Sequence, residues 1–147
     1  MPRKRKYKEK DVLRKAMLIF WAFGYEATNV RLLETEMGIN QFSIYSSFKN
    51  KKNLYLESLR LYIQYMFENE FLELSKEGAT ISDLKKFLNS CIEKENSELK
   101  MNGCMIVNAT CGKQFNDIDI QNEVKDFFTS LKKMLKQIIQ NSITKKR

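Results

Sequence analysis

The chain has 147 residues and a formal net charge of +8, with 43% apolar and 30% charged residues. That length fits one domain, or two small subdomains that share a core. One Pro and five Gly argue against both a strand-and-turn architecture and a disordered linker protein. The absence of His removes the commonest general base and the commonest zinc ligand. With three Cys and no CxxC pair, we expect no metal site, no cofactor and no disulfide framework.

The longest apolar run, residues 16–23, is too short to span a bilayer, and no signal-peptide cleavage pattern is present. We therefore expect a soluble, cytoplasmic protein without a membrane partner. The positive charge lies in the N-terminal part, because residues 1–60 carry 13 Lys and Arg against 6 Asp and Glu, whereas residues 61–147 carry 13 against 12. A basic terminus alone fits a solvated tail as well as a polyanion partner. The residues that follow it favour the partner.

Helical periodicity predicts six helices and leaves one further segment open. The first predicted helix spans residues 9–23 and ends at Gly24, and Thr28 is the expected N-cap of a second helix over residues 29–37. A tight turn at residues 37–40 leads into a third helix over residues 41–48. Three short helices with a Gly turn between the second and the third predict a helix-turn-helix.

Asn50 is the expected cap of a long fourth helix that ends near Ser75 and whose narrow polar stripe predicts a central position. The last helix is predicted over residues 120–144, with doubled apolar positions that indicate two packing partners. Asp117 and Asp119 are expected in a loop or cap. Residues 104–111 fit a short helix or a strand equally well. The fifth helix is expected to start within residues 80–83 and to bury Leu84, Phe87, Leu88, Cys91 and Ile92.

Little in this sequence suits catalysis. Without His, a nucleophile would need Lys or a carboxylate as its base. The acidic residues follow helical spacings typical of solvated faces, and the isolated Gly residues form no phosphate-cradling loop. We therefore predict that the protein is not an enzyme.

DNA binding fits residues 12–54 much better. The second helix of a helix-turn-helix enters the major groove, and the predicted helix over residues 41–48 carries Gln41, Ser43 and Ser46 on one side, with Phe42 beside them. Gln pairs bidentately with adenine, Ser bonds donors or acceptors, and Phe contacts a thymine methyl group. The residues expected around this helix, as candidates for phosphate contacts, are Thr28, Tyr45, Lys49, Lys51 and Lys52.

These residues resemble the N-terminal domain of TetR/AcrR-type transcriptional regulators. The resemblance is ungapped over residues 12–54 and rests on Phe20-x-x-x-Gly24-Tyr-x-x-Thr28, Gly38-Ile-Asn40 and Tyr45-x-x-Phe48-x-x-Lys51. It implies that Thr28, Tyr45 and Lys51 bond phosphates, and that Ile39, Ile44 and Phe48 are core. It also implies that four residues face the bases or the groove wall: Gln41, Phe42, Ser43 and Ser46.

Three residues depart from the family pattern. Glu34 stands where a small Ala is commonest, Ser47 replaces a frequent aromatic residue or His, and Phe42 is bulky where a small residue is common. These departures affect the expected docking geometry on DNA and leave the expected fold unchanged.

For the whole chain the resemblance implies an all-α fold. A DNA-binding domain over residues 1–50, basic tail included, is continuous with a helical ligand-binding and dimerisation domain over residues 51–147. Residues 103–109 resemble a Gly-Cys-x-x-Val-Asn motif at the start of the sixth helix in one branch, which favours a helix there. Members usually continue for two more helices that form the dimer's four-helix bundle. We therefore expect a short member, an early-ending frame or a fragment.

The aromatic and Met residues of helices four to seven are either ordinary core or the lining of an apolar ligand pocket. Cys104 follows Gly103 near a predicted helix N-terminus, with Lys100 close by, which favours a thiolate. It is either an electrophile or redox sensor, as in the resembling branch, or a small buried hydrophobe. The candidate ligand-binding residues are Tyr62, Met66, Phe87, Cys104, Asn108 and Phe127.

Three functional hypotheses follow. The first is a homodimeric repressor that binds a palindromic operator in double-stranded DNA and releases it when a small apolar or electrophilic effector binds. The second is a truncated family member that acts as a weak nucleic-acid or protein-interaction module without an effector response. The third is an enzyme that uses the apolar pocket. The oligomeric state at micromolar concentration separates the first two.

Overall fold

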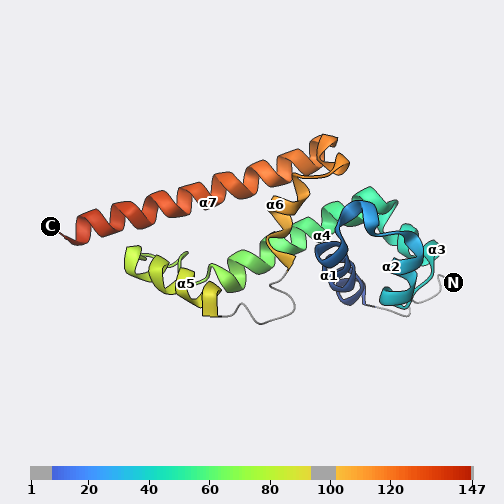
Figure 1. Cartoon of the computed structure of the whole chain (residues 1–147), viewed down its shortest axis with the longest axis horizontal. Helices are drawn as coiled ribbons and strands as arrows, with labels where there is room; N and C mark the ends of the chain where they lie inside the picture. Colours follow the sequence, from blue (N-terminus) through green and yellow to red (C-terminus); the bar gives the residue numbers. More distant parts are fainter. Residues whose placement is uncertain (1–7, 94–101, 147) are drawn as a thin grey trace.

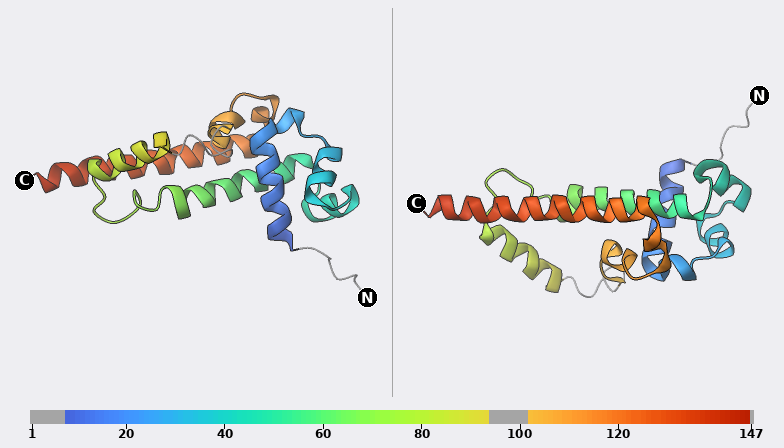
Figure 2. Two further views of the ribbon diagram at one scale, coloured as in Figure 1. Left: turned by 60° about the horizontal axis from the view of Figure 1, so that its bottom comes forward. Right: turned by 90° about the horizontal axis from the view of Figure 1, so that it is seen from above.

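The computed structural model describes residues 8–93 and 102–146, and every regular element in these ranges is a helix. The all-α prediction is therefore confirmed. The helices α1–α3 gather at one end of the molecule, while α4 and α7 extend away from them (Figure 1). Figure 2 shows from two further sides that α7 runs alongside α4. The elements are α1 (Glu9–Ala27), α2 (Val30–Met37), α3 (Gln41–Phe48), α4 (Lys51–Tyr65), the π-helical η1 (Met66–Glu70), α5 (Ile81–Glu93), α6 (Met105–Ala109), the 3-10 turn η3 (Lys113–Asn116) and α7 (Ile118–Lys145).

The junction between α1 and α2 differs in detail from the prediction. Gly24 has φ 78° and ψ 173°, so it interrupts α1 as expected, but the chain winds on to Ala27. Thr28 is not the N-cap of α2. Asn29 takes that role, because its side chain accepts a 2.9 Å hydrogen bond from the Leu32 amide. Thr28 is fully buried, and its hydroxyl donates to the Gly24 carbonyl at 2.6 Å.

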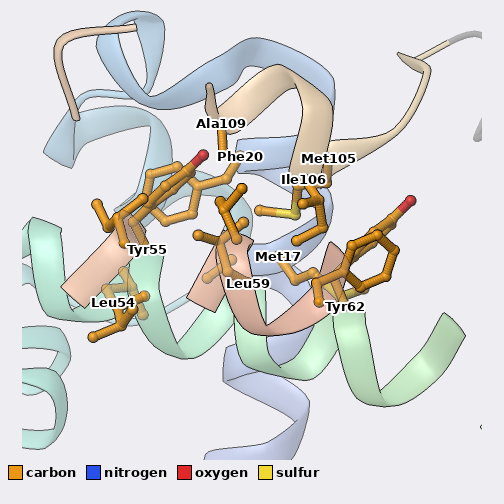
Figure 3. Packing of buried hydrophobic residues seen from close by; sticks show 14 of the residues in the cluster. Met17, Phe20, Leu54, Tyr55, Leu59, Tyr62, Met105, Ile106 and Ala109 are labelled. Carbon is orange, nitrogen blue, oxygen red and sulfur yellow. The ribbon is translucent and has the colours of Figure 1, made fainter. Parts of the chain in front are cut away.

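The core lies around α4, as its narrow polar stripe predicted. This helix contacts α1, α3, α6 and α7. Figure 3 shows side chains from α1, α4 and α6 meeting in one apolar cluster. The segment left open between helix and strand contains α6, whose inward residues Met105, Ile106 and Ala109 are buried. Within the first three helices, Ile44 and Phe48 are buried as expected, and Ile39 is half-buried.

The α-helical part of α4 ends at Tyr65, ten residues before the predicted end. The chain continues as the π-helix η1, in which the Phe71 amide bonds the Met66 carbonyl at 2.7 Å, and then as turns through Ser75. Periodicity alone does not distinguish a π-helix and the turns after it from an α-helix, because their apolar residues recur at nearly the same spacing.

The prediction that α5 buries its apolar face is wrong for Leu88 and Ile92, whereas Leu84 and Phe87 are half-buried against the core. No residue of α5 is buried, and Leu88 and Ile92 are 51% and 68% exposed. The start of α5 is held to α7, since the Ile81 amide donates to Ser142 Oγ at 2.9 Å. From there α5 diverges from α7 (Figure 2, right), so Leu88 and Ile92 in its second half stay exposed, while Leu84 and Phe87 pack against the core.

Helix α7 begins two residues earlier than predicted. Asp117 is its N-cap and accepts hydrogen bonds from the amides of Asp119 and Ile120, which confirms the predicted cap position for Asp117; Asp119 instead lies in the first turn of α7. As expected, α7 has more than one partner, because it contacts α4, α5 and α6. Two of the second residues in its doubled apolar positions remain exposed, however, Phe128 by 41% and Ile139 by 50%, while Leu135 is half-buried against the core. Within residues 8–93 and 102–146, no helix combines the length and the apolar character needed to cross a membrane.

Candidate nucleic-acid interface

The turn between α2 and α3 has the geometry of a helix-turn-helix. Gly38 adopts the left-handed conformation with φ 70° and ends α2, and its amide donates to the Glu34 carbonyl at 3.0 Å. Two residues later Asn40 begins α3, because its side chain accepts from the Ser43 amide at 2.9 Å. These local signals are the ones from which the turn was predicted.

One side of α3 is open to solvent. Gln41, Phe42 and Ser46 are exposed, and Ser43 is half-buried. Phe42 is 82% exposed, far more than a large apolar side chain needs to be in a folded domain. The structure thus places the four predicted base-facing residues on one short helix, with Phe42, Ser43 and Ser46 on the side away from its buried residues and Gln41 exposed in its first turn.

Glu34 bridges the two helices of the motif. Its Oε1 atom accepts a 2.6 Å hydrogen bond from the backbone amide of Gln41. Together with Asn40, it therefore satisfies two of the amides that the first turn of α3 leaves without helical partners. Glu34, which stands where the family pattern has Ala, thus fixes the start of α3. The sequence shows that Glu34 is unusual at this position, but no sequence pattern predicts its contact with Gln41 across the turn.

Lys51 begins α4, where a cation is unfavourable unless a partner is near. The structure supplies that partner in the ring of Tyr25, whose centroid lies 4.3 Å from Lys51 Nζ. Partial burial lowers the pKa of the Lys51 ammonium, while nearby Glu26 raises it. Tyr45 is half-buried on α3, and burial raises the pKa of its phenol. Thr28 is fully buried and its hydroxyl donates to the Gly24 carbonyl, so its phosphate contact stays a prediction.

Lys52, the next residue of α4, forms ion pairs with the start of α7. Its Nζ atom lies 2.9 Å from Asp117 Oδ2 and 3.6 Å from Asp119 Oδ2. The hydrogen bond from Lys52 lowers the pKa of the Asp117 carboxyl. Lys52 was predicted to lie near the interface. Its two partners could not be predicted, because they lie 65 and 67 residues further along the chain.

Lys49, between α3 and α4, has an unusual backbone. Its φ of 67° and ψ of −60° describe a γ-turn, which the Asn50 amide closes by donating to the Phe48 carbonyl at 2.8 Å. It is the one residue other than Gly with a positive φ in the described part of the chain. Its side chain is exposed.

The candidate ligand-binding residues fall into two groups. In the first, the buried Tyr62 hydroxyl bonds the Cys104 side chain and the Met105 amide, and burial raises the pKa of Tyr62 strongly. Cys104 is half-buried as the N-cap of α6, and Lys100 lies outside the described residues. Asn108 Nδ2 donates to the Asn102 carbonyl at 2.8 Å.

The second group lies between η1, α5 and α7. The Phe127 ring packs edge-on against Phe67 at 5.9 Å between centroids, and Phe87 packs against Phe71 at 5.6 Å. Met66 is half-buried beside them at the start of η1. None of the six candidates lines either of the two surface cavities identified, of about 490 and 630 Å³. The ligand pocket therefore stays a prediction.

The loop before α6 is attached to α1. Trp21 of α1 donates from its indole nitrogen to the Gly103 carbonyl at 2.8 Å, and its ring packs edge-on against Tyr62 at 5.1 Å. Because Tyr62 bonds Cys104 and Met105, the start of α6 contacts both α1 and α4. A change at Cys104 is therefore two contacts away from α1, which packs against α2.

Comparison with known proteins agrees with this geometry. Residues 12–58 match the family model described as bacterial regulatory proteins, tetR family. The chain is 27% identical over 131 residues to the HTH-type transcriptional repressor ComR of Escherichia coli (strain K12), a match that covers 86% of this chain and 61% of ComR. It is 22% identical over 109 residues to the uncharacterized HTH-type transcriptional regulator YezE of Bacillus subtilis (strain 168), covering 74% of this chain and 56% of YezE.

The chain spans about three fifths of the length of these curated relatives. No solved structure gives a significant match to it.

Proposed function

We propose that the protein is a DNA-binding transcriptional regulator, because residues 12–58 match the family model of bacterial regulatory proteins, tetR family. The observation that carries the proposal is the solvent-facing side of α3. It presents Phe42 and Ser46, with Gln41 exposed in the first turn, from a helix that Ile44 and Phe48 anchor in the core. A Phe side chain that is 82% exposed at the start of such a helix is suited to contact a thymine methyl group in the major groove.

In this proposal α3 enters the major groove, and its side chains read the bases. The caps from Glu34 and Asn40 support that division of roles, because they occupy amides that would otherwise attract a phosphate. Tyr45, Lys49 and Lys51 then contact the DNA backbone. The basic segment 1–7, which lies outside the described residues, adds sequence-independent affinity through its charge.

The regulatory part of the proposal is a homodimeric repressor with a palindromic operator, since two-fold protein symmetry is matched by operator symmetry. Its effector is a small apolar or electrophilic molecule. The hydrogen bond between Tyr62 and Cys104 supports an electrophile, because an adduct on the thiol would break a contact that leads to α1 through Trp21. The relative ComR is named as a repressor.

A second candidate, an interaction module without an effector response, is favoured by one observation. Exposed apolar residues lie on both α5 and α7, among them Leu88, Ile92 and Ile139, and such residues suit contact with another protein. The two candidates differ in whether a specific DNA sequence is bound.

The test is a selection of bound duplexes from a random-sequence library, followed by affinity measurements on the selected sequence at several salt concentrations. Lys51→Ala should weaken binding to all sequences alike and lower the salt slope by about 1. Gln41→Ala should cost about 1–3 kcal/mol at a single base position.

Lys136→Ala on the far part of α7 is the matched control and should change neither quantity. If no sequence is enriched and neither Gln41→Ala nor Lys51→Ala alters binding, the regulator proposal fails and the interaction module is favoured.

A further inference from the structure

Three elements meet beside the helix-turn-helix, and their charges are mixed. The end of α1 contributes Tyr25 and Glu26, the start of α4 contributes two lysines, and the start of α7 contributes Asp117 and Asp119. Each lysine already has an internal partner. Lys51 lies over the Tyr25 ring, and Lys52 pairs with the two aspartates.

The Asp117 carboxylate performs two tasks with its two oxygens. Oδ1 accepts from the amides of Asp119 and Ile120 at 2.9 and 3.3 Å and so caps α7. Oδ2 lies 2.9 Å from Lys52 Nζ. The cap holds the carboxylate in place, so the long Lys52 side chain is the partner that can move away.

A phosphate can reach Lys52 and displace it. The Lys52 side chain is 41% exposed, and ion pairs exposed to this extent are weak because water screens them. Lys52 is also the direct neighbour of Lys51, which the proposed function places at the DNA backbone. A DNA phosphate near the start of α4 would therefore find Lys52 within reach but held by a carboxylate.

We propose that Asp117 competes with DNA phosphate for Lys52, so that the first turn of α7 lowers the DNA affinity of the free protein. The proposal rests on the DNA-binding function proposed above. By linkage, any change that moves Asp117 away from Lys52 strengthens DNA binding, and DNA binding loosens the contact between the starts of α4 and α7. The Arg60–Glu123 pair, at 2.6 Å, ties the same two helices farther from the DNA and has no part in the competition.

The experiment measures the affinity for a random-sequence DNA duplex across a salt series. It compares variants in which an acidic side chain is replaced by an uncharged one. Asp117→Asn keeps an oxygen that can cap α7 but removes the closer of the two carboxylate charges that pair with Lys52. It should raise affinity several-fold and increase the magnitude of the salt slope by about 0.9, which corresponds to one added phosphate contact. Asp117→Ser, which also keeps a capping oxygen, should behave in the same way if the Asn variant is poorly folded.

Glu123→Gln is the matched control, because it removes one negative charge from an α4–α7 ion pair away from the DNA-binding helices. It should leave the salt slope unchanged. In a Lys52→Ala background, Asp117→Asn should no longer alter the slope, since the competing cation is gone.

An unchanged slope in both folded Asp117 variants would overturn the proposal, and so would an equal effect with and without Lys52. If the unmodified protein binds no DNA at any salt concentration, the proposed function fails, and the competition fails with it. If it binds DNA and only the Asp117 effect is missing, the competition alone is refuted.

Discussion

Lys49 occupies a backbone conformation that glycine would adopt at lower cost. With φ 67° and ψ −60°, its Cβ crowds the neighbouring carbonyl groups, and strain at such positions amounts to about 1–3 kcal/mol. A lysine at this position therefore needs a compensating benefit. The γ-turn holds an exposed ammonium between α3 and α4, at the edge of the proposed DNA surface. Contact between this ammonium and the phosphate backbone of DNA is a benefit that would offset the strain.

Lys49→Gly should consequently change stability and binding in opposite directions. Relief of strain, partly offset by the greater freedom of Gly in the unfolded chain, should raise the free energy of unfolding by about 1 kcal/mol. Loss of the charge should weaken binding to all DNA sequences and lower the salt slope by about 1. Urea denaturation and a salt series of binding measurements provide the two readings.

Lys49→Ala is the companion variant, because it removes the charge and keeps the strain. It should lose the same DNA affinity without becoming more stable. A lower stability for Lys49→Gly than for Lys49→Ala would contradict the strain argument.

At the scale of elements, the first helices could be predicted because their signals are local. Gly38, Asn40 and Asn50 each act through backbone conformation or a cap within three residues, so α2, α3 and the start of α4 follow from short stretches of sequence. The cap of α2 was misassigned by one residue, because Thr28 and Asn29 are both good caps and only tertiary packing buries the former.

Contacts between distant segments could not be predicted in this way. The hydrogen bond from the Gln41 amide to Glu34 and the ion pair of Lys52 with Asp117 depend on how helices cross, which no local pattern encodes. The same limit explains α5. Its amphipathic pattern correctly predicted a helix, but an apolar face indicates only that burial would be favourable and does not supply a neighbour.

This reading of α5 leads to a prediction about stability. The double variant Leu88→Gln, Ile92→Gln should change the free energy of unfolding of the chain by less than about 0.5 kcal/mol, because both side chains are already exposed. Leu59→Ala, at a fully buried position of α4, should cost about 2–5 kcal/mol by the same measurement. A large loss in the α5 variant would show that α5 packs more tightly than this structure describes.

At the scale of the whole molecule, binding to a palindromic operator requires two copies of α3. We expect light scattering at micromolar concentration to give twice the chain mass of 17.4 kDa. The exposed apolar residues on α5 and α7 are consistent with an additional contact surface. A mass of one chain across the concentration range would contradict the palindromic operator.

The short connection between α3 and α4 has a further consequence. Only Lys49 and Asn50 separate the two helices, and both are fixed by backbone hydrogen bonds, so α3 must turn together with α4 as one rigid piece. With 15 residues, α4 is about 22 Å long, and a tilt of about 5° displaces one end by about 2 Å relative to the other. In a dimer the displacements of the two subunits add and change the distance between the two α3 helices. Successive major grooves on one side of DNA lie at a fixed spacing of about 34 Å. A tilt that is small within one subunit would therefore prevent the two α3 helices from entering successive major grooves together.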